Sequence, residues 1–176
     1  VGPRINAAGR MESGGKAVEL LKSNSREEVE KIAAEINQNN EARKDLDKKA
    51  TEEAKKMLTS CADLTSKKTT VVYGKDWHKG VIGIVASRLI EKYYKPTIVF
   101  TKSNDLITGS ARSVKDFDIY AAIESCSHLL THFGGHKFAA GLSLEEKNLE
   151  EFMRLFEQEV EKKITDGQMI PEIEID

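Results

Sequence analysis

The sequence contains few of the residues that build covalent or metal-bound frameworks. Its 176 residues include 2 cysteines, 3 prolines and 1 tryptophan, and aromatic residues make up 6%. Cys61 and Cys126 have neither metal-type spacing nor a CxxC pattern, so neither a zinc site nor a disulfide framework is supported. Sparse cysteine of this kind is typical of a reducing compartment, and we therefore expect a cytoplasmic protein.

The sequence also lacks an excess of charge and long apolar runs. With 27 Lys+Arg against 29 Asp+Glu, the formal net charge is −2, so any site for a polyanion must be local. No apolar run approaches the roughly 18 to 20 residues of a membrane span, and we expect no membrane partner. The chain starts without methionine and stops within an alternating Ile-Glu-Ile-Asp pattern, so we expect both ends to be cuts through a longer protein.

The strongest helical signal follows Ser25. Ser25 and Glu28 have the spacing of a capping box, and apolar residues then recur in three- and four-residue steps as far as Met57. A helix of about 33 residues would be about 50 Å long, and its polar centre favours a connector between two bodies over a coiled coil. Residues 1–14 lack periodicity and predict a structured loop, followed by a short helix over 16–22.

The composition changes at about residue 67, where β-branched segments begin to alternate with amphipathic ones. The pattern predicts a small α/β fold, with a mixed sheet flanked by helices and preceded by the long connecting helix. We expect strands at 69–73, 97–101, 106–112 and 138–144, and helices at 80–94, 118–127 and 149–164.

Three glycine-associated polar clusters lie where a strand ends or a helix begins. The first, from Trp77 to Gly83, follows a strand and enters a helix, an arrangement that offers free backbone N–H groups to an anion; packing of the helix start is the alternative. In the second, Ser110 and Arg112 share one face of a strand and can hold a phosphate together, although an isolated pair of this kind is more often solvated. The third places His136 directly after Gly134 and Gly135.

The sequence contains no self-sufficient active site. There is no nucleophile elbow and no Asp/His cluster of the kind that a two-metal phosphoesterase needs. His128, His132 and His136 recur every four residues, but the glycines before His136 should break a helix and no HExxH pattern is present. We therefore expect no catalytic residue and no metal site in this chain, and we interpret Cys126 as a core residue.

Four segments together resemble the RecJ family of single-stranded-DNA-specific 5′ to 3′ exonucleases, within the DHH phosphoesterase superfamily. They are Gly2-Pro-Arg-Ile-Asn-Ala-Ala-Gly-Arg-Met11, Trp77-His-Lys-Gly-Val-Ile-Gly-Ile-Val-Ala-Ser-Arg88, Gly109-Ser-Ala-Arg-Ser113, and Phe133-Gly-Gly-His136 with Ala139-Ala-Gly141. The segments occur in the order found in the family and cover most of the chain outside the long helix.

The resemblance implies a division of labour. The family's two Mn²⁺ or Mg²⁺ ions are held by a catalytic domain whose motifs are absent here, so we expect this chain to hydrolyse nothing alone. Residues 1–14 would be the end of that domain, 15–65 connecting helices, 66–165 the DHH-associated domain, and 166–176 the start of an oligonucleotide-binding barrel. The implied partner is single-stranded DNA, in DNA repair and recombination; the oligomeric state is not implied.

By matching position, the resemblance also implies which residues meet DNA. Arg4, Asn6 and Arg10 would contact the DNA backbone near the active cleft. The phosphates would be gripped, without regard to base, by a second group: His78, Ser110, Arg112, Ser113, Gly134, Gly135 and His136. Two alternatives stay open: a DHH-family phosphodiesterase acting on short oligonucleotides or cyclic dinucleotides, and a structural spacer with solvated arginines.

Overall fold

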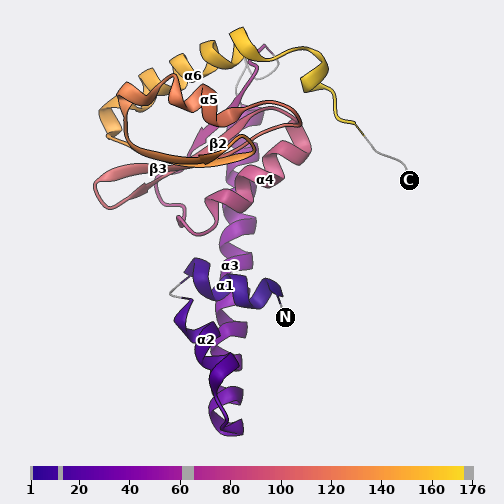
Figure 1. Ribbon diagram of the computed structural model, residues 1–176, viewed down its shortest axis with the longest axis vertical. Helices are drawn as coiled ribbons and strands as arrows, with labels where there is room; N and C mark the ends of the chain where they lie inside the picture. The colour runs from indigo at the N-terminus through magenta and orange to yellow at the C-terminus, as the bar shows by residue number, and fades with distance from the viewer. Residues whose placement is uncertain (1, 12–13, 61–65, 173–176) are drawn as a thin grey trace. The chain divides into compact units, whose positions relative to one another are not determined.

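The computed structural model of the protein describes residues 2–11, 14–60 and 66–172. The chain divides into two compact units, Val1–Lys49 and Ala50–Asp176, and the division falls within a long helix, α3. Figure 1 identifies the elements of both units. Each unit contains buried apolar side chains of its own. In the described ranges, no helix combines the length and the apolar character needed to cross a membrane.

The first unit contains α1 (Gly2–Met11), α2 (Gly15–Lys22) and the first part of α3 (Arg26–Thr59). Its core is small: Ala8 and Ala17 pack with Ile32 and Ile36 of α3. The loop predicted for residues 1–14 is therefore wrong over α1. The helix buries small alanine side chains rather than a stripe of large apolar residues, and such a contact leaves almost no periodic signal in the sequence.

The start of α3 follows the predicted cap. The backbone N–H of Glu28 donates to Ser25 Oγ at 3.4 Å, as the capping-box spacing predicts. The Glu28 carboxylate instead accepts from Ser23 Oγ at 2.5 Å, and Ser23 Oγ in turn accepts from the Ser25 N–H at 3.1 Å. The second capping-box contact, between the Glu28 carboxylate and the Ser25 N–H, is therefore indirect and is mediated by the Ser23 hydroxyl.

The second unit is built on a five-stranded sheet in the order β1-β2-β3-β5-β4. The strands are β1 (Thr70–Tyr73), β2 (Thr97–Ser103), β3 (Leu106–Arg112), β4 (Leu130–His136) and β5 (Ala139–Leu144). Strands β1 and β2 are parallel, and all other pairs are antiparallel. The predicted mixed sheet flanked by helices, with a long helix before it, is confirmed.

One strand, β4, was not expected from the sequence. Its residues are mostly exposed, and it contains Gly134 and Gly135 together with two histidines, so it shows no apolar alternation. Its register with β5 also shifts between Leu130 and His132. Pairing along β5, rather than side-chain burial, defines this edge strand.

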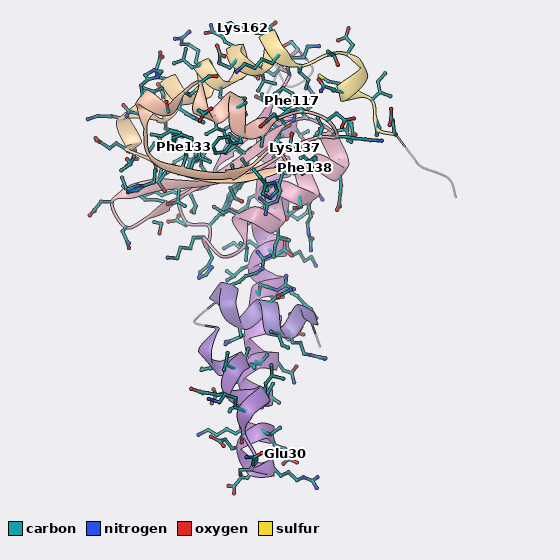
Figure 2. All side chains as sticks on the ribbon, in the orientation of Figure 1. Glu30, Phe117, Phe133, Lys137, Phe138 and Lys162 are labelled. Atoms are coloured by element: carbon teal, nitrogen blue, oxygen red, sulfur yellow. The ribbon has the colours of Figure 1, made fainter. Side chains whose placement is uncertain are left out.

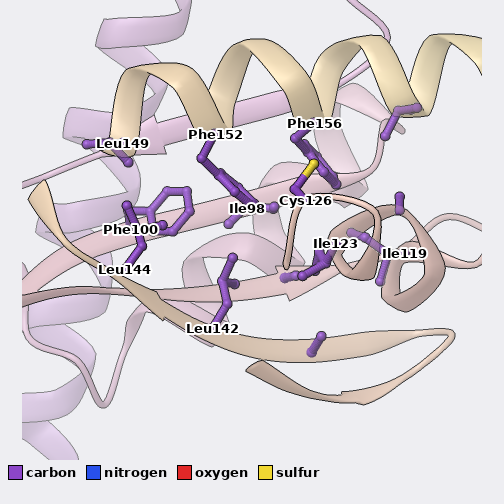
Figure 3. Close-up of a cluster of buried hydrophobic side chains, with 14 of the residues drawn as sticks. Ile98, Phe100, Ile119, Ile123, Cys126, Leu142, Leu144, Leu149, Phe152 and Phe156 are labelled. Carbon is purple, nitrogen blue, oxygen red and sulfur yellow. The ribbon is translucent and has the colours of Figure 1, made fainter. Parts of the chain in front are cut away.

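The main core lies on one face of the sheet, under α5 (Ile119–Glu124) and α6 (Leu149–Lys163). Figure 1 shows these two helices on one side of the sheet and α4 (Ile82–Tyr93) on the other. Figure 3 shows Phe152 and Phe156 of α6 pointing into this cluster. The two rings are stacked, with centroids 5.8 Å apart, and Phe100 of β2 meets Phe152 edge-on at 5.7 Å.

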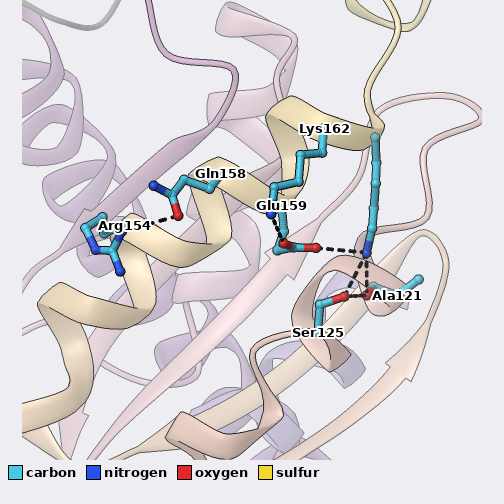
Figure 4. Close-up of polar contacts among 7 residues, drawn as sticks. Ala121, Ser125, Arg154, Gln158, Glu159 and Lys162 are labelled. Carbon is cyan, nitrogen blue, oxygen red and sulfur yellow. Dashed lines mark hydrogen bonds and ion pairs between the residues drawn. The ribbon is translucent and has the colours of Figure 1, made fainter.

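Polar contacts join α5 to α6 at the rim of this core (Figure 4). Lys163 Nζ donates to Ser125 Oγ at 2.7 Å and to the Ala121 carbonyl at 3.3 Å. A hydrogen bond from Lys162 lowers the pKa of Glu159, and Lys163 adds to the effect. Because both lysines are exposed to solvent, we expect the contribution of these contacts to stability to be small. At the other end of α5, Asp118 accepts from the Ala121 N–H at 3.0 Å, the predicted N-cap.

The chain after α6 contains a short 3-10 helix, Gly167–Met169. No strand is present over residues 170–172, and 173–176 lie outside the described residues. The alternating Ile-Glu-Ile-Asp pattern, which the resemblance assigns to the start of a barrel, therefore lies outside the described residues.

Cys126 belongs to the core, as predicted, with 1% of its surface exposed. Burial raises the pKa of its thiol to about 11, so the reactive thiolate is scarce at pH 8. In a Cys61→Ser background, we expect the folded protein to react with a disulfide reagent at least about 100-fold more slowly than the urea-unfolded protein. Equal rates at pH 8 would show that the thiol is accessible in the folded state.

Candidate nucleic-acid interface

The candidate site lies on the sheet face opposite the main core, across β3, β5 and β4. Arg112 pairs with Ala139, which pairs with His136; one level along, Ser110 pairs with Gly141, which pairs with Gly134. Residues paired across strands share a face, so these side chains project on one side of the sheet. We call Ser110, Arg112, Gly134, His136 and Gly141 the shelf. Arg112 and His136 lie two strands apart, about 10 Å at the usual strand spacing.

Two glycines leave the centre of the shelf without side chains. Gly134 and Gly141 are exposed and lie opposite each other, and a Cβ atom added at either would meet no heavy atom within 4 Å. Packing in the described structure therefore does not require glycine at these two positions. Their effect is to leave bare backbone next to Ser110, where the backbone of a polymer can approach the sheet closely.

Gly135 has a different role. Its φ is 151°, and an added Cβ would lie 2.4 Å from the Ala139 carbonyl oxygen and 2.5 Å from Ala140 Cα. Only glycine fits both this backbone conformation and this close approach of β5. We therefore interpret Gly135 as the residue that lets β4 pair closely with β5, and so as a support for the neighbouring shelf.

Arg112 is held in place by its own strand and by α4. Its Nη1 donates to the Ala111 carbonyl at 2.7 Å and to Ser110 Oγ at 3.2 Å, which confirms that the two side chains share a face. A Cβ added at Gly83 of α4 would lie 3.0 Å from Arg112 Nη2 and 3.1 Å from Ser110 Oγ. The missing side chain at Gly83 thus lets the first turn of α4 lie directly against both shelf residues.

The first turn of α4 supplies positive potential at this place. It has no acidic residue, and its N-cap residue Val81 makes no side-chain cap hydrogen bond. The first N–H groups of a helix lack intrahelical acceptors and carry the positive end of the helix dipole. Together with the Arg112 guanidinium, this helix end makes the adjoining part of the shelf favourable for an anion.

In the loop before α4, Trp77 and His78 of the first predicted cluster have different environments. Trp77 is buried, its Nε1 donates to Glu53 at 2.7 Å, and its ring fills the space beside Gly74. Trp77 therefore packs the loop, which was the alternative interpretation. His78 is half-buried, and its Nδ1 accepts from the Gly80 N–H at 3.0 Å, so Nε2 is the donor of the neutral ring.

His136 and Ser113 lie at the end of the shelf where β4 turns into β5. His136 is exposed, and its Nδ1 accepts from the Phe138 N–H at 3.3 Å, which leaves Nε2 to donate outward. The hydroxyl of Ser113 donates to the Phe117 carbonyl at 2.6 Å. Because that proton is engaged, the structure gives Ser113 an anchoring contact, and its role in phosphate binding stays a prediction.

The three predicted residues of the N-terminal segment belong to the other compact unit. Arg4, Asn6 and Arg10 are all exposed on α1. Their predicted contact with DNA is separate from the geometry of the shelf and stays a prediction.

The described residues do not fit a two-metal centre. Over 2–11, 14–60 and 66–172, no three His, Cys, Asp or Glu side chains gather where they could hold a metal ion. His132 and His136 lie on β4 and His128 lies in the preceding 3-10 helix, so their four-residue spacing does not place them on one helix face. We therefore assign no metal-dependent step to these residues.

The sequence missed two members of the site. Gly141 faces Gly134 and extends the bare strip, and Gly83 brings α4 against Arg112. Both glycines occur in segments that resemble the RecJ family, and this was the available signal. Their roles depend on strand register and helix docking, which sequence spacing does not reveal.

Comparisons with known proteins identify the family of this chain. The sequence pattern of the DHHA1 domain matches residues 66–162. The chain is 36% identical over 177 residues to the single-stranded-DNA-specific exonuclease RecJ of Bacillus subtilis, covering 99% of this chain and 22% of that protein. Identity to RecJ of Haemophilus influenzae is 35% over 170 residues, covering 91% and 29%.

A solved structure shows the same fold. The crystal structure of RecJ from Thermus thermophilus in complex with Mn²⁺ matches with a TM-score of 0.81 and 31% identity, over 92% of this chain and 24% of that one. The chain thus spans about a quarter of the length of the proteins it matches. The resemblance seen in the sequence is confirmed.

Proposed function

Because this chain belongs to the DHHA1 domain family, we propose that it is the phosphate-gripping part of a single-stranded-DNA-specific 5′ to 3′ exonuclease, acting in DNA repair and recombination. On this proposal, residues 1–14 end the catalytic domain, 15–65 connect, 66–165 bind DNA, and 166–176 begin an oligonucleotide-binding domain. The Mn²⁺ or Mg²⁺ ions and the hydrolytic step belong to residues outside this chain. The cytoplasmic location inferred from sparse cysteine stays a prediction.

The observation that carries this proposal is the shelf itself. A guanidinium, a hydroxyl and an imidazole lie on one sheet face, around a strip of bare backbone and beside a helix start that has no side-chain cap. Arginine, hydroxyl and helix-terminal N–H groups are the usual partners of phosphate oxygens. None of the five shelf residues is a carboxylate, and a carboxylate there would repel a polyanion. The bare backbone strip can accommodate an extended nucleic-acid strand.

The arrangement favours binding of the DNA phosphates without recognition of the base sequence. Contacts to phosphate position a nucleic acid, whereas sequence is read at base edges. A processive exonuclease needs its terminal phosphodiester placed on the metal ions while the neighbouring phosphates are held in any sequence. In this scheme Arg112 and His136 act as positioning residues, and they do not break the bond.

Titration of a labelled, 5′-phosphorylated single-stranded oligonucleotide tests the proposal. We expect salt-sensitive binding, with log affinity falling linearly with log salt by about 0.7 per neutralised phosphate, and similar affinity for different sequences. Incubation of the pure chain with Mn²⁺ should leave the oligonucleotide intact. Affinity that is independent of salt would contradict phosphate gripping, and metal-dependent digestion would contradict the division of labour.

The same assay distinguishes the exonuclease proposal from the alternative of a small-substrate phosphodiesterase. A phosphodiesterase of short oligonucleotides or cyclic dinucleotides should bind those ligands as tightly as it binds a longer strand. Competition with an unlabelled cyclic dinucleotide therefore distinguishes the two: we expect it to displace the 5′-phosphorylated oligonucleotide only weakly, since it offers fewer phosphates to the shelf.

A further inference from the structure

The turn that joins β4 to β5 displays an aromatic ring next to the shelf. His136 pairs with Ala139, so the connection consists of Lys137 and Phe138 alone. Phe138 is 47% exposed, although phenylalanine usually contributes to a core. Figure 2 labels Lys137 and Phe138 side by side at this turn.

The turn is anchored at three points of its backbone. The Phe138 N–H donates to His136 Nδ1 at 3.3 Å, and the Phe138 carbonyl accepts from the Ser113 N–H at 2.9 Å. The Lys137 carbonyl accepts from the Ile119 N–H at 3.2 Å. These bonds tie the turn to the end of β3 and to the start of α5. The exposure of the ring is therefore a property of an ordered turn.

The neighbours of the Phe138 ring are basic groups of the shelf end. The His136 ring lies edge-on to it, with centroids 6.1 Å apart, and Lys137 Nζ lies 4.6 Å from its centroid. Phe138 is not among the side chains that pack against the main core. An exposed aromatic ring next to two groups suited to phosphate is the combination that single-stranded nucleic acid uses: charge for the backbone and a flat surface for the bases.

We propose that Phe138 is a stacking platform for one nucleobase of the strand whose phosphates lie on the shelf. The inference rests on the proposed function and extends it, because it adds a contact to a base where the shelf contacts only phosphates. Stacking accepts every base through its π-face, so binding stays independent of sequence. Lys137, which lies over the ring in the free protein, would move to a neighbouring phosphate as the base takes its place.

Two oligomers of equal charge test this inference: a single-stranded DNA 12-mer and an abasic 12-mer with the same sugar-phosphate backbone. We expect Phe138→Ala to weaken binding of the DNA about tenfold, with the affinity for the abasic oligomer and the salt slope unchanged. Phe138→Trp should restore binding of the DNA, whereas Phe138→Leu, which keeps apolar area without a π-face, should not.

Tyr93→Ala is the matched control. Tyr93 also lies under a lysine, with Lys92 Nζ 5.3 Å from its centroid, but at the far end of α4 from the shelf. Unchanged DNA affinity in Phe138→Ala, or an equal loss for both oligomers, would overturn the stacking proposal. If the wild-type chain binds neither oligomer, the proposed function itself fails, a result distinct from the failure of stacking alone.

Discussion

Replacing Arg112 with alanine is expected to weaken binding of 5′-phosphorylated single-stranded DNA by about 10- to 100-fold, the usual value of a charge-assisted hydrogen bond to phosphate. The slope of log affinity against log salt should become smaller by about one phosphate contact. The physical reason is that Arg112 supplies the guanidinium of the shelf and is already held in place by the Ala111 carbonyl. Fluorescence anisotropy at several salt concentrations measures both quantities.

Arg154→Ala provides the matched control for charge. Arg154 is exposed on α6, where Figure 4 shows its contact with Gln158, and it also pairs with Glu151 at 2.7 Å. Helix α6 covers the opposite face of the sheet. Its removal changes net charge equally and should leave the affinity within about twofold, since an exposed ion pair contributes little. Arg112→Lys should fall between wild type and alanine, because lysine keeps the charge but loses the planar fork. Equal effects of Arg112→Ala and Arg154→Ala would refute a specific role of the shelf.

Gly135→Ala is expected to lower the free energy of unfolding by about 2 to 4 kcal/mol, because strain at a positive φ and overpacking each cost about 1 to 3 kcal/mol. The added Cβ would lie within 2.5 Å of two backbone atoms of β5, so the β4–β5 pair must separate or distort. Urea denaturation monitored by circular dichroism measures the change.

The neighbouring substitution Gly134→Ala is the control for this prediction. It adds the same methyl group one residue away, where no heavy atom lies within 4 Å, and we expect stability within about 0.5 kcal/mol of wild type. Its effect should appear in DNA affinity instead, because the methyl group enters the bare strip of the shelf. If both variants lost stability equally, the distinction between a glycine needed for packing and a glycine kept open would be wrong.

Local signals in the sequence predicted much of the second unit. Hydrophobic periodicity placed α6, and Asp118 marked the start of α5. The alternation of side chains along β3 put Ser110 and Arg112 on one face, which their hydrogen bond confirms. These features depend on residues close together in the chain, so spacing alone reveals them.

The errors fall on segments whose own residues show little apolar periodicity. Strand β4 contains exposed glycines and histidines and is stabilised by its pairing with β5. Its sequence therefore lacks the apolar alternation that would predict a strand. Helix α1 packs through alanines such as Ala8, whose small side chains give a weak periodic signal. In both cases pairing or packing with another element, rather than a periodic apolar face, stabilises the segment.

By itself, the sequence identified the candidate phosphate-binding groups of this protein and placed Ser110 and Arg112 on one face of one strand. Only the tertiary structure decided that they meet. The order of strands β3, β5 and β4 brings His136 to the level of Arg112, and the register sets Gly134 opposite Gly141 beside Ser110. The physical reason is that register follows from hydrogen bonding and burial across the whole sheet, and a slip of one residue would turn these side chains to the other face.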